Sequence, residues 1–188
     1  KRQIEAGSYI LATMATKGRL KLNNFNPKDL ALPLKLYKGM GLKIKKLSNS
    51  SYEIYCKTLK PIKKISTKEF PGYPTDLQAQ LIATQLKSGL KSKVVENIFE
   101  NRFIHIPELR RFGANLSIKG KTVIIDKTSN LLGAEVMATD IRASFSLIIA
   151  AMMSKGKTVI NRIYHLDRGY EDFDLKLKKC GVNISRKK

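Results

Sequence analysis

The chain has 188 residues, with 36 Lys and Arg against 15 Asp and Glu, so its formal net charge at pH 7 is +21. A hydrophobic fraction of 43% is ordinary for a globular domain and excludes a chain too polar to fold. The longest apolar run, 147–153, is far shorter than the roughly 18 residues of a membrane span, so we expect no membrane-spanning helix.

In chain order, three segments predict helices that are apolar or small on nearly every side: 4–18, 75–89 and 139–156. Each segment ends in a glycine, a common helix terminator. Strands are expected after the second and third helices, at 93–98 and 157–163. Because a helix that is apolar all round is buried all round, these segments predict a helical interior.

A second pattern marks an internal repeat. Gly41, Gly113 and Gly181, about 70 residues apart, each follow a helical pattern and precede alternating apolar residues. We expect each glycine to end a helix and a short strand to follow it. The repeating unit is strand, helix, strand, helix, strand. It predicts one domain of three units, about 1–66, 67–131 and 132–188, of which the third lacks its last strand.

The predicted strands alternate between apolar and polar residues, as in 116–126, so each sheet has one face toward solvent. Together with the apolar helices, this alternation predicts an α/β fold with the helices inside and the sheets outside. The strand missing from the third unit implies that residues from elsewhere complete the fold.

Each unit begins its buried helix with an acidic residue: Glu5, Asp76 or Asp140. One interpretation is capping, because an acid at a helix start binds free backbone N–H groups and the positive end of the dipole. The alternative for Asp76 and Asp140 is a functional role. Two prolines and a glycine form a turn before Asp76, and Arg142 follows Asp140 at a helix start, where a guanidinium could help to bind an anion.

The arginines support an anionic substrate, because a guanidinium can hold carboxylate or phosphate through two hydrogen bonds. Four of the nine lie in segments that also carry acids or histidine: Arg102, Arg142, Arg162 and Arg168. The segment 162–173 adds His165, Asp167 and Glu171. A surface ion-pair cluster, with Asp167 capping the final helix, is the alternative for this segment.

No metal or cofactor is expected. His105 and His165 are the only histidines, and neither has the Cys or carboxylate spacing of a metal site. Cys56 and Cys180 form no C-x-x-C pair, so we expect structural roles for both. Two distant cysteines favour a reducing compartment, and we predict a cytoplasmic protein.

The large positive charge has two interpretations. Most of it comes from lysines scattered over predicted surface segments, which favours a compositional bias. The alternative is a basic domain that binds nucleic acid or an acidic partner.

Four segments carry a resemblance to a known family. They are "FPGYPTDLQAQ" (70–80), "IFENRFIHIPELRRFGA" (98–114), "VMATDIRAS" (136–144) and "VINRIYHLDRGYE" (159–171). Together they resemble UDP-N-acetylglucosamine enolpyruvyl transferases, which catalyse the first committed step of peptidoglycan precursor synthesis. The resemblance runs from about residue 4 to the end of the chain. The related shikimate-pathway enolpyruvyl transferase lacks the second and fourth stretches.

The resemblance implies an inside-out, barrel-like α/β domain of three helix-and-sheet units, one of two similar domains with substrates between them. This chain resembles the C-terminal part, and the family's N-terminal strands would complete the third unit. The reaction moves the enolpyruvyl group of phosphoenolpyruvate to the 3-hydroxyl of UDP-N-acetylglucosamine. It needs a base, cations for the carboxylate and phosphate, and an acid.

By resemblance, Asp76 is the base that also holds the sugar hydroxyl, and Ile98 lies in the nucleotide-sugar site. Asp140 supports proton transfer or the intermediate. The groups implied around phosphoenolpyruvate are three arginines, Arg102, Arg142 and Arg168. Arg110 and Arg111 are expected only on a solvated face of the helix that Pro107 begins.

The family's acid is a Cys on a loop of the other domain, and neither cysteine here has that context. The family's Lys-Asn pair near its N-terminus also has no counterpart in this sequence. We therefore expect this chain to be inactive without the Cys-loop domain, supplied in the same chain or as a separate one. The alternatives are the basic binding domain described above and an inactive remnant of the enzyme.

Overall fold

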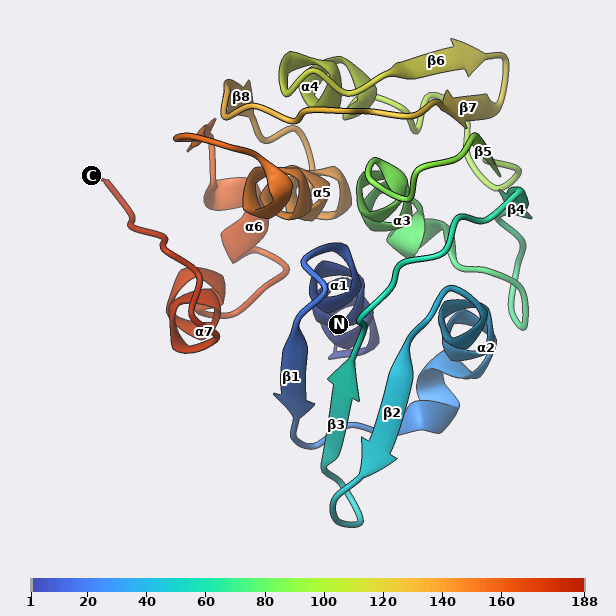
Figure 1. Cartoon of the computed structure of the whole chain (residues 1–188), viewed down its shortest axis with the longest axis vertical. Coiled ribbons are helices and arrows are strands. Elements are labelled where there is room, and N and C mark those ends of the chain that lie inside the picture. The colour runs from blue at the N-terminus through green and yellow to red at the C-terminus, as the bar shows by residue number, and fades with distance from the viewer. Residues whose placement is uncertain (1, 188) are drawn as a thin grey trace.

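Three helices form the centre of the molecule (Figure 1). The computed structural model describes residues 2–187. The central helices pack against one another and are α1 (Arg2–Ala15), α3 (Gln78–Gln85) and α5 (Ile141–Met153). Every residue of α3 is buried, including its glutamines. The predicted helical interior is confirmed. The helix α3 is shorter than the predicted 75–89 at both ends, because a separate 3-10 turn, η2 (Thr75–Leu77), precedes it and it ends at Gln85.

The strands form three separate sheets outside these helices rather than a closed barrel (Figure 1). The first is antiparallel, in the order β1 (Arg19–Leu22), β3 (Tyr52–Tyr55), β2 (Lys43–Lys46). The second has the order β4 (Lys64–Ser66), β5 (Ser92–Val95), β7 (Thr122–Ile125), β6 (Leu116–Lys119), with β4 parallel to β5 and the other pairs antiparallel. The third pairs β8 (Glu135–Met137) with β9 (Val159–Asn161) in parallel.

Shorter helices connect the strands: α2 (Ala31–Gly39) after the 3-10 turn η1 (Pro27–Leu30), α4 (Ile106–Arg111), α6 (Tyr164–Asp167) and α7 (Phe173–Lys179). Within residues 2–187, no helix has the length and apolar character needed to cross a membrane. The sheets have the predicted alternation between a solvent-facing and a buried face. In β7, for example, Val123 and Ile125 are buried while Thr122 and Ile124 are partly exposed.

The three repeat glycines all have positive φ angles, which a glycine adopts without a side-chain penalty. Gly41 and Gly113 are followed by β2 and β6 as predicted. The strand predicted after Gly181 is wrong, because residues 182–187 pair with no strand and form none. The segment 116–126 is also not one strand. It turns at Gly120, where φ is +54°, and becomes the β6–β7 hairpin.

A buried polar contact joins all three parts of the interior. The hydroxyls of Ser8 in α1 and Tyr170, just after α6, are 2.8 Å apart. Gln80 in α3 donates to both, at 3.1 and 3.3 Å. The Tyr170 ring also stacks on Phe145 of α5, with ring centres 4.6 Å apart. These contacts fix the relative positions of the elements that carry the site described next.

Candidate active site

Asp76 and two arginines meet at the starts of α3 and α5. Asp76 lies in η2, and its Oδ1 is 2.5 Å from Nε of Arg142 and 3.9 Å from Nη2 of Arg102. The Asp76 side chain is 31% exposed, so a ligand can reach it. Its carboxylate caps neither η2 nor α3. The capping interpretation is therefore wrong for Asp76.

Asp140 does cap its helix. Its Oδ1 accepts from the backbone N–H groups of Arg142 and Ala143, at 2.7 and 2.8 Å, at the start of α5. Arg142 therefore bonds Asp140 through its backbone and Asp76 through its side chain. The two acids and Arg142 form one connected group, in which only Asp76 has a carboxylate free of helix capping.

Arg102 reaches this group from the turn before α4. Its guanidinium lies over the Phe99 ring, 4.6 Å from the ring centre. Burial and the nearby charge of Arg142 lower its pKa, while the acids Asp76, Glu96 and Asp140 oppose that shift. Two guanidinium groups thus lie near one carboxylate. That arrangement leaves positive charge available for an anionic ligand.

Two glycines allow the site segments to approach closely. A Cβ on Gly7 of α1 would lie 2.7 Å from Leu77, the neighbour of Asp76. A Cβ on Gly169 would collide with Ile141, which lies between Asp140 and Arg142. A side chain at either position would push apart the segments that carry the site residues.

The contact of Gly169 brings the Arg168 segment to the start of α5, but Arg168 itself is exposed. Among residues 2–187, it takes part in no side-chain ion pair and does not join the group around Asp76. Ile98 is partly buried in the turn between β5 and Arg102. The structure therefore gathers Asp76, Arg102, Asp140 and Arg142 directly and leaves Arg168 and Ile98 beside them on neighbouring segments.

His105 is buried beneath this site, 1% exposed, and neither of its ring nitrogens has a partner in the described part of the chain. Burial lowers its pKa to about 4, and the nearby Asp140 opposes the shift. At neutral pH the ring is therefore uncharged.

Three other polar side chains of the segment 100–113 bind backbone groups. Nε of Arg110 donates to the Leu116 carbonyl at 3.0 Å, and Nε of Arg111 donates to the Glu135 carbonyl at 2.8 Å. Glu108 accepts from the Met137 amide at 2.8 Å. Although both arginines are exposed, the prediction of a merely solvated face is wrong. These bonds attach α4, predicted to begin at Pro107 and observed from Ile106, to the adjacent strands.

Glu96 is the residue that the sequence patterns did not single out. It follows β5 directly, is 3% exposed, and its carboxylate accepts bonds from Thr67, Thr75 and two backbone amides of the Ile98 turn. No local pattern pointed to it, because its two hydroxyl partners lie 29 and 21 residues earlier in the chain.

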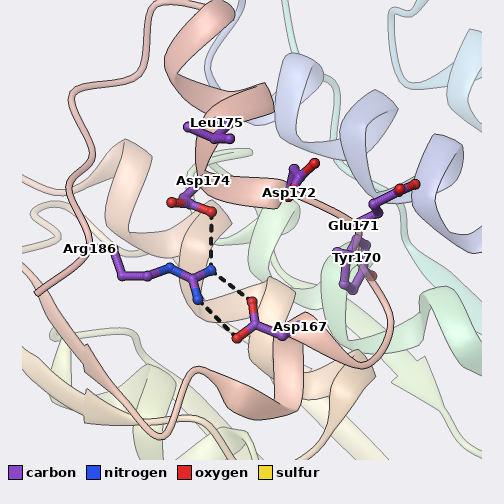
Figure 2. Close-up of a pocket in the computed structure, with 7 residues that line it drawn as sticks. All are labelled: Asp167, Tyr170, Glu171, Asp172, Asp174, Leu175 and Arg186. Atoms are coloured by element: carbon purple, nitrogen blue, oxygen red, sulfur yellow. Dashed lines mark hydrogen bonds and ion pairs between the residues drawn. The ribbon is translucent and has the colours of Figure 1, made fainter. Parts of the chain in front are cut away.

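The acidic cluster near α6 is a different kind of site. Figure 2 shows Arg186 between Asp167 and Asp174, with bonds of 2.7 and 3.0 Å to Asp167 and 3.1 Å to Asp174. The prediction that Asp167 takes part in a surface ion pair is confirmed, and its partner is Arg186. The predicted cap by Asp167 is wrong, since the N-cap residue of α7 is Asp172. The remaining lining residues of this pocket include Glu171 and Asp172, so it does not suit phosphate or carboxylate.

The remaining sequence candidates have structural surroundings. Glu5 pairs with Lys176 of α7 at 2.7 Å. Cys56 is buried with a raised pKa, and Cys180 is exposed; both are free thiols. In the part of the chain that the structure describes, no three His, Cys, Asp or Glu residues are placed to hold a metal ion. His165 packs against the Tyr164 ring, with ring centres 4.3 Å apart.

Comparison with known structures shows that this architecture is the enolpyruvyl transferase fold. The enolpyruvyl transferase NikO from Streptomyces tendae superposes with a TM-score of 0.86 at 24% identity, over 97% of this chain and 43% of that one. EPSP synthase from Acinetobacter baumannii superposes with a TM-score of 0.59 at 15% identity, over 82% and 38%. The predicted α/β fold with buried helices and outer sheets is confirmed.

Sequence comparison identifies the family. The family of EPSP synthase (3-phosphoshikimate 1-carboxyvinyltransferase) matches residues 3–177, and the chain belongs to it. The UDP-N-acetylglucosamine 1-carboxyvinyltransferase of Pelagibacter ubique (strain HTCC1062) is 48% identical over 98% of this chain and 44% of its own length. That of Koribacter versatilis (strain Ellin345) is 45% identical over 98% and 42%. The chain spans less than half the length of these relatives.

Proposed function

We propose that this chain is part of a transferase that moves the enolpyruvyl group of phosphoenolpyruvate to the 3-hydroxyl of UDP-N-acetylglucosamine, at the start of peptidoglycan synthesis. The observation that carries the proposal is the ion-paired group of Asp76, Arg142 and Arg102 at adjacent helix starts. The relatives named UDP-N-acetylglucosamine 1-carboxyvinyltransferase, which match nearly the whole chain, support the same reaction.

Asp76 is the proposed base. When UDP-N-acetylglucosamine binds, its 3-hydroxyl replaces Arg142 at the Asp76 carboxylate, which takes the proton as the sugar oxygen attacks C2 of phosphoenolpyruvate. A proton added to the methylene carbon completes a tetrahedral intermediate. Phosphate then leaves, the methyl group loses a proton, and the enolpyruvyl ether forms. Ile98 would line the nucleotide-sugar side of the site.

The arginines are the proposed anion site. Arg102 and Arg142 already lie beside the base, and Arg168 could turn inward from its exposed position to hold the carboxylate or phosphate. Asp140 keeps the start of α5 in place and would support proton transfer or the intermediate. These fixed charges would stabilise the negative charge that develops on the substrate.

The rest of the site would come from elsewhere. We propose that the three units, about 1–66, 67–131 and 132–188, form one domain, and that strands outside this sequence pair with β9. In the first two sheets, β3 and β7 pair antiparallel with the strand that follows the central helix, and β9 has no such neighbour in the described residues. The acid would lie on a Cys loop of a second domain. The cytoplasmic location stays a prediction.

The test is phosphate release from phosphoenolpyruvate and UDP-N-acetylglucosamine. The chain is assayed alone and mixed with a separately produced Cys-loop domain of a related transferase. We expect release only in the mixture, and loss of release with Arg168→Ala. Full turnover by the chain alone would contradict the proposed division of the site. No release from the mixture, with both chains folded, would contradict the proposed activity.

A further inference from the structure

Glu96 is a buried acid that makes no ion pair in the described residues, although its charge acts on nearby Arg102. Its side chain follows the carboxyl end of β5 and is 3% exposed. Among residues 2–187, no Lys, Arg or His forms an ion pair with it. A buried carboxylate without a counter-ion is costly unless hydrogen bonds compensate the lost hydration.

Four donors provide that compensation. Oε1 accepts from the Thr67 hydroxyl at 2.8 Å and from the backbone amides of Ile98 and Phe99 at 2.9 and 3.2 Å. Oε2 accepts from the Thr75 hydroxyl at 2.8 Å. A carboxylate has about four acceptor positions, and four donors match that number, with three of them on Oε1.

The donors come from three separate segments of the site. Thr67 follows β4, and its hydroxyl oxygen also accepts a hydrogen bond from the backbone N–H of Asn97 at 2.8 Å. Thr75 precedes Asp76 in η2. The amides of Ile98 and Phe99 begin the turn that ends at Arg102, and Phe99 supplies the ring on which Arg102 lies. One carboxylate thus touches the segment of the base candidate and the segment of an arginine.

We infer that Glu96 is a positioning residue: its carboxylate holds the end of β4, the Asp76 segment and the Ile98–Arg102 turn in one fixed arrangement. It acts on a ligand only through Asp76, Ile98 and Arg102. The ligand part of this inference rests on the proposed function, whereas the connection of the three segments does not.

The hydrogen bonds predict different results for two substitutions. In Glu96→Gln, the amide oxygen can still accept from Thr67 and both backbone amides, and the NH₂ group can donate to Thr75, because a hydroxyl also accepts. Glu96→Ala removes all four bonds. Glutamine should therefore preserve most of the arrangement, and alanine should release it.

Hydrogen exchange on the chain alone tests the connection. With Glu96→Ala, we expect the Ile98 and Phe99 amides to exchange at least about tenfold faster, the factor of one lost bond to a charged acceptor. The Leu42 amide, bonded to Tyr37 in another unit, should keep its rate. With Thr75→Val, Ile98 and Phe99 should stay protected, while the Leu77 amide of η2 should exchange faster.

The matched control is Thr13→Val, which removes a buried hydroxyl bonded to the Tyr9 carbonyl in α1. It should change none of these rates. Unchanged protection of Ile98 and Phe99 in Glu96→Ala would overturn the inference, as would an equal acceleration at Leu42. If Glu96→Ala does not fold, Thr75→Val and Glu96→Gln carry the test.

Kinetics of the two-chain mixture test the effect on the ligand. We expect Thr75→Val to raise KM for UDP-N-acetylglucosamine at least about fivefold, and Glu96→Gln and Thr13→Val to keep it within about twofold, since lost bonds weaken binding by such factors. An unchanged KM in Thr75→Val would overturn the positioning role. If the wild-type mixture is inactive, the proposed function is wrong, and so is the role of Glu96 in positioning residues for this ligand. The hydrogen-exchange experiment still decides whether Glu96 connects the three segments.

Discussion

The same dipeptide, Thr-Asp, lies just before α3 and just before α5, and the two aspartates have different contacts. Asp140 has the extended backbone of an N-cap residue and binds two amides of α5. Asp76 lies inside the 3-10 turn η2, after Pro74, and its carboxylate binds Arg142 and Arg102 instead. The local backbone therefore decides whether the acid caps a helix or pairs with arginine side chains.

The largest expected difference between the two aspartates is in activity. Asp76→Asn should lower phosphate release by the two-chain mixture about 10²- to 10⁴-fold, because an amide cannot take the substrate proton. Asp140→Asn should cost less, since asparagine is also a good N-cap. Steady-state rates of both variants give the comparison, and equal losses would show that the two acids share one role.

The pH dependence of stability should report on the buried His105, which lies close enough to Asp140 for the charge of that acid to act on it. The folded-state pKa of His105 is about 4 against an ordinary 6.5. Above pH 6.5 the ring is neutral in both states and has no effect. As the pH falls from 6.5 to 4, only the unfolded state gains the proton, which should remove up to about 3 kcal/mol of stability.

Urea unfolding at several pH values, compared between the wild type and His105→Leu, measures this contribution. The carboxylates titrate in both proteins, so the difference between the two pH profiles isolates the histidine. Parallel profiles between pH 6.5 and 4 would contradict the assigned burial of a neutral ring.

The capping role of Asp140 predicts a smaller effect. Asp140→Ala should lower the free energy of unfolding by about 1 kcal/mol, the usual value of an N-cap, whereas Asp140→Asn should be nearly neutral. Denaturant melts of both variants test this. An equal loss in the asparagine variant would mean that charge, rather than the cap bonds, supports α5.

The smallest effect is expected at the ion pair itself. Arg142→Gln should change unfolding free energy by less than about 1 kcal/mol, because the Arg142 and Asp76 side chains are 43% and 31% exposed and solvent weakens such a pair. The same melts measure it. A loss well above that of Asp140→Ala would make the pair part of the framework rather than of the ligand site.

The sequence was informative where the chemistry is local. Gly41 and Gly113 end helices before strands, because a positive φ is a property of the glycine itself. The Asp140 cap depends on the next three residues and was one of two open interpretations. The strand predicted after Gly181 does not form, because a strand needs a second strand to pair with. The local sequence pattern cannot show whether such a partner is present.

The candidate site was only partly predictable. Asp76, Arg102 and Arg142 were candidates from the residues themselves, family resemblance implied their roles, and they are close together in the structure. Glu96 was missed because its importance depends on hydroxyls contributed by Thr67 and Thr75 from other segments. Arg110 and Arg111 were misread for the same reason, since their carbonyl acceptors lie on strands that fold back onto α4.

The contact of Ser8, Gln80 and Tyr170 has a consequence for how the chain folds. Its hydroxyl pair spans 162 residues of sequence, so the bond cannot form until the chain has been synthesised as far as Tyr170. Contacts of such long sequence separation slow folding, because the closure of a long loop precedes the gain from the contact. During translation, the polar groups of Ser8 in α1 and Gln80 in α3 would therefore lack the Tyr170 hydroxyl until that residue has been synthesised.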